Sequence, residues 1–202
     1  MTTRLPCRTC GDLIHQDTAA KNNGLCMPCK GGYRARIEES KRQRELERAY
    51  EKSAERRHWL TLVERVHQSN EGFQALSPDE QTYFALRCLI GEVFNGGFHQ
   101  FFSNHSGAYY GVAVNGLFEL EAMRSHQLLT QAKEALFGDQ AVPVDFEERN
   151  QLLRVVEEND IAYSRIGKQL DELDKLFWAE PDELSNHCSR FAIDRGLYAR
   201  DA

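Results

Sequence analysis

The sequence has no long apolar run and few strand signals. Without eighteen consecutive apolar residues, the chain contains no candidate membrane span. The opening residues Met-Thr-Thr-Arg-Leu-Pro have no apolar signal core, so we expect a cytoplasmic, reducing location. The scarcity of strand patterns favours an all-α fold. With 202 residues, the chain has room for one sizeable domain and a small module.

What the chain does have is two cysteine pairs near its start, Cys7-x-x-Cys10 and Cys26-x-x-Cys29. Zn²⁺ binds four thiolates tetrahedrally at about 2.3 Å, and each short pair brings two sulfurs to one ion. Because four thiolates close the coordination shell, we predict a structural zinc ribbon rather than a catalytic centre. Three alternatives are a disulfide pair, which needs an oxidising compartment, four unrelated thiols, and His15 as a replacement ligand.

The net charge of −6 is unevenly distributed. Residues 1–58 carry thirteen Lys and Arg against eight Asp and Glu, whereas residues 59–202 carry twelve against twenty-three. The acidic part is expected to repel nucleic acid and to attract basic surfaces, unless its charge serves only solubility. The basic head keeps nucleic acid open as an alternative partner, beside protein docking or simple structural support.

A charged segment from Tyr33 to about Gln68 contains neither glycine nor proline. Strong helix formers dominate it, which predicts one helix of about 35 residues. Its first half has no sustained apolar seam, and its second half has an apolar stripe that begins at Trp59. We therefore expect a compact helical protein in three parts: a zinc ribbon at 1–33, a charged helical spacer at 34–58 and an acidic α-helical domain at 59–202.

The next helix has a clear start, because Ser77, Pro78 and Glu80 match an N-cap, a first-turn proline and a capping box. We expect it to stop at Asn95-Gly96-Gly97. Its predicted inward side chains are Tyr83, Phe84, Leu86, Leu89, Ile90 and Val93. Further helical patterns cover about 108–119, 121–136, 160–178 and 181–196.

The most distinctive run of the second part lies between Glu92 and Gly107. Its glycine pair suits a helix end, its phenylalanines suit anchoring to the core, and its polar side chains can satisfy exposed backbone groups. A structural turn is therefore the preferred interpretation, and a small-molecule or catalytic site near His99 and Asn104 is the alternative. The structural residues are Asn95, Gly96, Gly97, Phe98, Gln100 and Gly107.

This run resembles the bacterial family typified by DNA-mimic protein nineteen. The stretch around residues 173–178, an apolar–Asp–x–x–aromatic pattern, is similar as well. The resemblance covers about residues 60–200. It implies a compact α-helical domain without enzymatic activity, a homodimer as one assembly, and an acidic face that replaces the phosphates of DNA on a basic DNA-binding protein. The zinc head lies outside the resemblance.

A DNA mimic needs a row of carboxylates, because duplex DNA carries one charge about every 1.7 Å along its axis. Acidic residues gather in several places of the second part, including 119–121 and 171–174. The candidate partner-binding residues are Asp139, Asp145, Glu147, Glu148, Glu157, Glu158 and Asp160.

Overall fold

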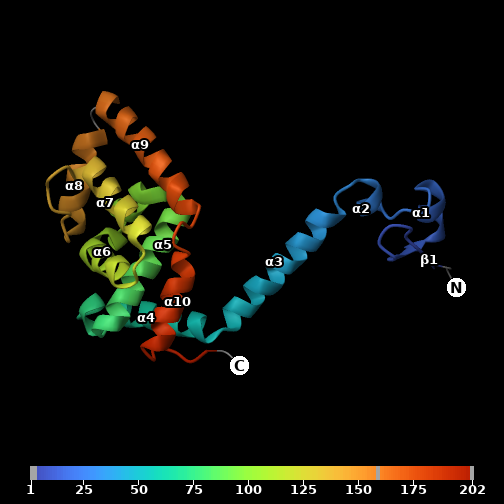
Figure 1. Cartoon of the computed structure of the whole chain (residues 1–202), viewed down its shortest axis with the longest axis horizontal. Helices are drawn as coiled ribbons and strands as arrows, with labels where there is room; N and C mark the ends of the chain where they lie inside the picture. The colour runs from blue at the N-terminus through green and yellow to red at the C-terminus, as the bar shows by residue number, and fades with distance from the viewer. Residues whose placement is uncertain (1–3, 158–159, 201–202) are drawn as a thin grey trace. The chain divides into compact units, whose positions relative to one another are not determined.

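The computed structural model describes residues 4–157 and 160–200, without the side chains of 156–163 (Figure 1). The chain divides into two compact units, Met1–Ser53 and Ala54–Ala202. Within the described residues, the only strands are two of three residues each, and the other regular elements are helices. The predicted all-α class is therefore confirmed. None of the described helices is long and apolar enough to cross a membrane.

The first unit begins with a small hairpin. Strands β1 (Arg4–Pro6) and β2 (Leu13–His15) pair antiparallel. Two short helices follow, α1 (Gln16–Lys21) and α2 (Met27–Lys30), and the unit ends with α3 (Arg34–Lys52). Among the described residues of this unit, the buried ones are Cys7, Ala19, Asn22 and Cys26. So small a core is insufficient to hold a fold by apolar burial alone.

The predicted continuous helix from residue 33 to 68 is wrong in one respect. Helix α3 stops at Lys52, and α4 (Ala54–Gln68) starts after Ser53. Ser53 has an extended backbone (φ −68°, ψ 158°), and its N–H donates to the carbonyl of Tyr50. Serine in this conformation is typical of a helix N-cap, so the interruption follows from residue type as well as geometry.

The second unit is a bundle around α5 (Pro78–Ser103), which packs against α6 (Tyr110–Glu119), α9 (Asp160–Trp178) and α10 (Leu184–Asp194) (Figure 1). Helix α7 (Met123–Phe137) packs on α6 and α9, and α8 (Phe146–Glu157) contacts α5 and α9. Two 3-10 helices complete the unit, η1 (Gly72–Ala75) and η2 (His105–Tyr109).

Helix α5 starts as predicted, with a complete capping box between Ser77 and Glu80. All six side chains predicted to face inward are buried: Tyr83, Phe84, Leu86, Leu89, Ile90 and Val93. Helix α8, by contrast, is absent from the predicted elements. Its signals were an Asp at position 145 and two Glu residues in the first turn, which are typical of a helix start.

Candidate metal centre and partner-binding surface

Four cysteine sulfurs of the first unit meet at one point. The Sγ atoms of Cys7, Cys10, Cys26 and Cys29 all lie within 4.8 Å of one another, and no disulfide joins them. The Cys10 and Cys26 sulfurs are 3.7 Å apart. A tetrahedron with metal–sulfur bonds of about 2.3 Å has edges of about 3.8 Å, so this donor set fits Zn²⁺. The two pairs predicted from the sequence therefore form one candidate metal centre.

Local backbone geometry presents these sulfurs. After the first pair, Gly11 has φ +78° and its N–H donates to the carbonyl of Cys7 at 2.9 Å. The N–H of Cys26 donates to Cys7 Sγ at 3.2 Å, which ties one pair to the other. Backbone N–H groups, first that of Cys10 and then that of Cys26, stabilise the Cys7 thiolate and lower its pKa to about 6. Burial, followed by the neighbouring thiols, raises the pKa of Cys29 to about 12, so metal binding would have to displace the proton of this thiol.

His15 has a different role from the cysteines. Its Nδ1 accepts a hydrogen bond from the N–H of Asp17 at 3.3 Å, so it caps α1. Its side chain is also 44% exposed. This geometry matches the predicted surface position rather than that of a fourth ligand.

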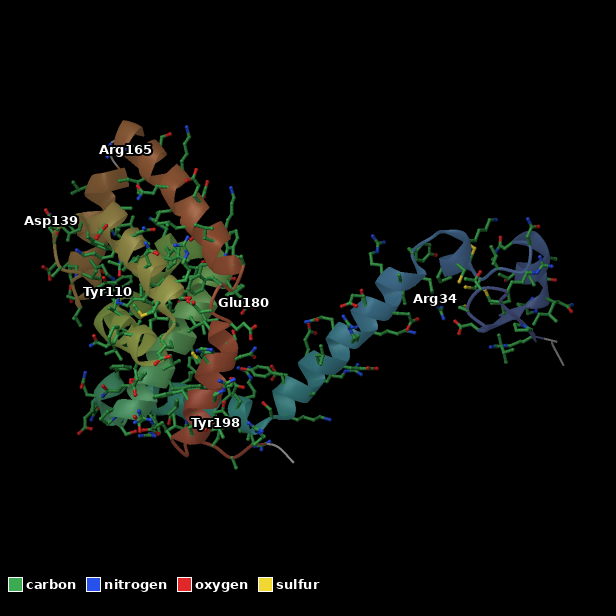
Figure 2. All side chains as sticks on the ribbon, viewed as in Figure 1. Arg34, Tyr110, Asp139, Arg165, Glu180 and Tyr198 are labelled. Carbon is green, nitrogen blue, oxygen red and sulfur yellow. The ribbon has the colours of Figure 1, made fainter. Side chains whose placement is uncertain are left out.

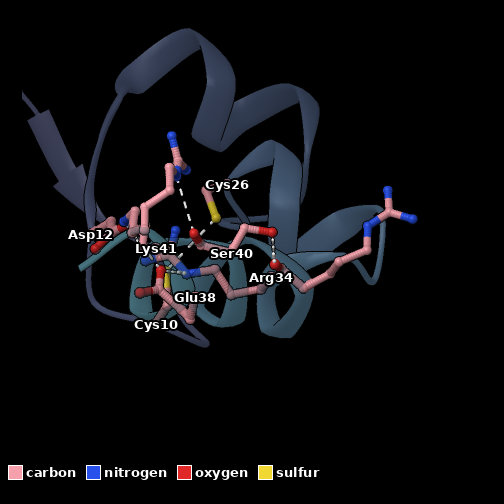
Figure 3. Close-up of polar contacts among 9 residues, drawn as sticks. Cys10, Asp12, Cys26, Arg34, Glu38, Ser40 and Lys41 are labelled. Carbon is pink, nitrogen blue, oxygen red and sulfur yellow. Dashed lines mark hydrogen bonds and ion pairs between the residues drawn. The ribbon is translucent and has the colours of Figure 1, made fainter. Parts of the chain in front are cut away.

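The cysteine module, which runs from β1 to α2, is tied to the start of α3 by Arg34 (Figure 3). The Arg34 guanidinium forms an ion pair with Asp12, two residues after Cys10, and a second one with Glu38 at 3.3 Å. Lys41 pairs with the same Glu38 at 3.3 Å. These contacts fix the first turns of α3 to the metal-binding segment.

The glycine pair of the second unit divides α5 into two helical parts that meet at a kink. Gly96 and Gly97 leave helical geometry, Gly97 with φ +78°, and the helix then continues to Ser103. The first helical part of α5 therefore ends at the glycines, as predicted, whereas the second helical part, which runs to Ser103, was not predicted. In a regular helix the carbonyl of Val93 would bind the N–H of Gly97. It accepts instead from Nε1 of Trp178 at 2.7 Å.

Asp174 binds the backbone on the other side of this kink. Its Oδ1 accepts a hydrogen bond from the N–H of Phe98 at 2.8 Å, and a Cβ at Gly97 would overlap the same carboxylate. The side chain is only 8% exposed. Asp174 is thus part of the core and does not belong to an acidic surface.

Gln100, Asn104 and Ser106 bind a carboxylate with their side chains rather than backbone groups, which corrects the predicted role of these three residues. Glu92 accepts hydrogen bonds from Gln100 Nε2 at 2.6 Å, Asn104 Nδ2 at 2.9 Å and Ser106 Oγ at 2.9 Å. A hollow of about 300 Å³ beside them is lined by Glu92, Asn95, Gln100 and Ser106, together with Trp59, Arg87, Cys88 and Gly91. Neither His99 nor Asn104 lines it. This network stabilises the segment that follows the kink.

Arg149 is an important residue that the sequence reasoning missed. It is fully buried, and its guanidinium donates to the carbonyls of Phe102 (2.7 Å), Pro143 (2.8 Å) and Asn104 (2.7 Å). Burial lowers its pKa. A Cβ at Gly107 would lie 2.6 Å from Arg149 Nε, which explains the glycine there. Charge alone suggested a surface residue, because buried arginine is rare.

Comparison with known proteins assigns a family to the part of the chain that contains the kink and Arg149. The family model described as "DMP19-like protein" matches residues 74–195, which include the kink, Asp174 and Arg149. The chain belongs to the DMP19-like family. Among curated proteins and solved structures, nothing matches the chain. The resemblance predicted from the sequence is therefore confirmed for this region, which we call the DMP19-like domain, and the cysteine module, α3 and α4 lie before it.

Four of the seven candidate partner-binding carboxylates lie in the loop between α7 and α8 or in the first turn of α8. Asp139, Asp145, Glu147 and Glu148 are all exposed, and Figure 2 labels Asp139. Asp145 also caps α8, because its Oδ1 accepts from the N–H of Glu148 at 2.8 Å. The other three candidates, Glu157, Glu158 and Asp160, lie outside the residues whose side chains the structure describes. The surface is thus defined by its four described members.

Proposed function

We propose that the DMP19-like domain is a non-enzymatic interaction domain that occupies a basic DNA-binding protein by imitating the charge of DNA. The observation that carries this proposal is the membership of residues 74–195 in the DMP19-like family. The resemblance of the kink motif to DNA-mimic protein nineteen supports the same function.

The charge distribution supports this proposal. No Lys or Arg lies between Lys133 and Arg149 in the sequence, and Arg149 itself is buried. The exposed carboxylates of Asp139, Asp145, Glu147 and Glu148 therefore follow one another along the chain without an intervening cation. Clustered exposed carboxylates attract the Arg and Lys side chains of a DNA-binding surface. We call these four residues the acidic surface.

For the first unit we propose a structural zinc ion on Cys7, Cys10, Cys26 and Cys29. The donor set is closed by four thiolates, so the ion would supply folding energy and leave no position for substrate. Free thiols in this arrangement also support a reducing, cytoplasmic location. In this proposal the zinc module is a docking element joined to the acidic domain, and a homodimer stays a prediction for light scattering to check.

The test is capture of a DNA-binding protein by the purified chain, with duplex DNA as competitor. We expect duplex DNA to displace the captured protein, and we expect the complex to weaken as salt increases. The variant Asp139→Asn/Glu147→Gln/Glu148→Gln should reduce capture; it spares Asp145 because that residue caps α8. The matched control Asp171→Asn/Glu172→Gln/Glu180→Gln removes the same charge from other exposed positions.

Three results would contradict the proposal. A complex that is insensitive to salt would argue against a charge-based interface. A captured protein without a DNA-binding surface would argue against mimicry. Equal losses in the variant and its charge-matched control would place the contact elsewhere on the acidic domain.

A further inference from the structure

Three cations surround one turn of the cysteine module. The turn at residues 22–25 is closed by the N–H of Leu25, which donates to the carbonyl of Asn22 at 3.0 Å. Arg8 lies across this turn, because a Cβ at Gly24 would come within 2.8 Å of its Nε. Lys30 reaches it from α2, with its Nζ donating to Asn22 Oδ1 at 2.7 Å, and Lys21 ends α1 directly before it. We call Arg8, Lys21 and Lys30 the cation cluster.

The members of this cluster are available to an external anion. All three are exposed, and within the described part of the chain none of them forms an ion pair with a carboxylate. Three other cations of this unit do have carboxylate partners: Arg34 pairs with Asp12, Lys41 with Glu38, and Arg42 with Glu39 at 2.9 Å. The sequence also has no Asp or Glu from residue 18 to residue 37. The cluster therefore gathers three exposed cations without a carboxylate partner, beside a four-thiolate zinc site whose own net charge would be −2.

We propose that this cation cluster binds the phosphate backbone of duplex DNA. Lys and Arg side chains bind phosphate oxygens without reading the base sequence, and such contacts supply most non-specific affinity. A single-stranded ligand fits less well, because its bases need exposed aromatic faces. The sequence has no Phe, Trp or Tyr before Tyr33, and this single ring, 38% exposed, lies against Gly31, where a Cβ would overlap it. The proposal goes beyond the function assigned to the acidic domain and does not depend on it.

A DNA-binding head has a physical use beside a DNA mimic. Contact with DNA would raise the local concentration of the acidic domain around proteins that are bound to the same duplex. Its affinity is expected to be low and strongly dependent on salt. Three neutralised phosphates give a slope of about −2.7 in log affinity against log salt, or roughly a fortyfold loss when salt increases fourfold.

The test uses the full-length, zinc-loaded chain and a fluorescent 20-base-pair duplex in anisotropy titrations. We expect binding at about 50 mM salt, in the range of about 1 to 100 µM, and the salt dependence given above. The variant Arg8→Gln/Lys21→Gln/Lys30→Gln should reduce the affinity at least tenfold while the zinc content is retained. The control Arg154→Gln/Arg165→Gln/Lys168→Gln makes the same charge change at exposed positions of the second unit and should leave the affinity unchanged.

Each contrary outcome overturns the proposal. Absence of duplex binding up to about 100 µM at low salt would show that the cluster is only a solvated surface. Equal losses in the variant and the control would show a response to net charge alone. Displacement of the duplex by polyglutamate at equal charge concentration would assign the cluster to acidic protein, and tighter binding of a single strand would assign it to bases. These results are distinct from failure of the acidic domain, because no protein partner is present.

Discussion

The carboxylate of Asp174 in α9 accepts a hydrogen bond from the backbone N–H of Phe98 in α5 at 2.8 Å, across 76 positions of the chain. One turn further along α9, Trp178 binds the carbonyl of Val93 at 2.7 Å. Both backbone groups lose their helical partners because the intervening glycines leave helical geometry. The two separate motifs of the sequence thus form one structural unit, in which α9 closes the kink of α5.

Replacement of Asp174 by alanine should destabilise the second unit. The N–H of Phe98 is buried and would lose its acceptor. A buried, unsatisfied donor costs about 1–3 kcal/mol, and urea unfolding followed by circular dichroism would measure this loss. An unchanged unfolding midpoint would contradict the role assigned to Asp174. Glu172→Ala, at an exposed position of the same helix, is the control and should change stability little.

Asp174 should also affect the pH dependence of stability. Burial raises the pKa of its carboxyl, although the hydrogen bond from Phe98 opposes the shift. The native state then holds this proton more tightly than the unfolded state, in which the pKa is about 3.9. The contribution of Asp174 to the free energy of unfolding is therefore greatest at low pH. It declines as the pH rises from about 4 through the raised pKa of the native state. Compared with Asp174→Asn, the unmodified chain should lose stability over this window; parallel profiles in urea titrations would refute the shift.

Gly97→Ala tests the backbone of the kink. The residue has φ +78°, and an added Cβ would overlap the Asp174 carboxylate. We expect destabilisation of more than about 1 kcal/mol, because a left-handed conformation and a steric overlap act together. Gly91→Ala is a matched control, since it lies in the same helix with nothing within 4 Å of an added Cβ. That control should be neutral or stabilising by up to about 1 kcal/mol, and thermal melts of the two variants would separate them.

Arg149→Met should be the most damaging single change around the acidic surface. It removes the donors for the carbonyls of Phe102, Asn104 and Pro143 and keeps the apolar volume of the side chain. We expect a loss of about 3 kcal/mol or more, since several buried acceptors lose their partners at once. Arg154→Met changes an exposed arginine of the same helix and should cost less than about 0.5 kcal/mol. Similar unfolding midpoints for the two variants would contradict the buried role of Arg149.

The cysteine cluster predicts one zinc ion per chain, which native mass spectrometry can count. Cys26→Ser should reduce zinc binding and unfold the first unit, because few other residues of that unit are buried. The second unit has its own apolar core, so its thermal transition should persist. Cys88→Ala removes a thiol outside the cluster and should keep the zinc. Retention of a full equivalent of zinc by Cys26→Ser would refute the ligand set.

Some elements of the fold could be predicted from the sequence and others could not. The capping box at Ser77 and Glu80 and the buried face of α5 depend on local spacing, and both predictions are confirmed. The break at Ser53 and helix α8 have weaker local signals, and both escaped prediction. The alternative of a catalytic site near His99 and Asn104 required polar side chains that are free to contact a substrate. Glu92 accepts hydrogen bonds from three of them, a contact that the sequence did not predict.

The sequence by itself determined the helical class, the cluster of four cysteines and the family resemblance, because periodicity, short spacings and motifs are local properties. Only the tertiary structure decided what the Gly96-Gly97 pair does, since its conformation depends on Asp174 and Trp178 in a distant helix. The same is true of Arg149, whose burial is set by carbonyls from two other segments. The sequence around a single polar residue does not indicate its hydrogen-bond partners when packing brings those partners from distant segments.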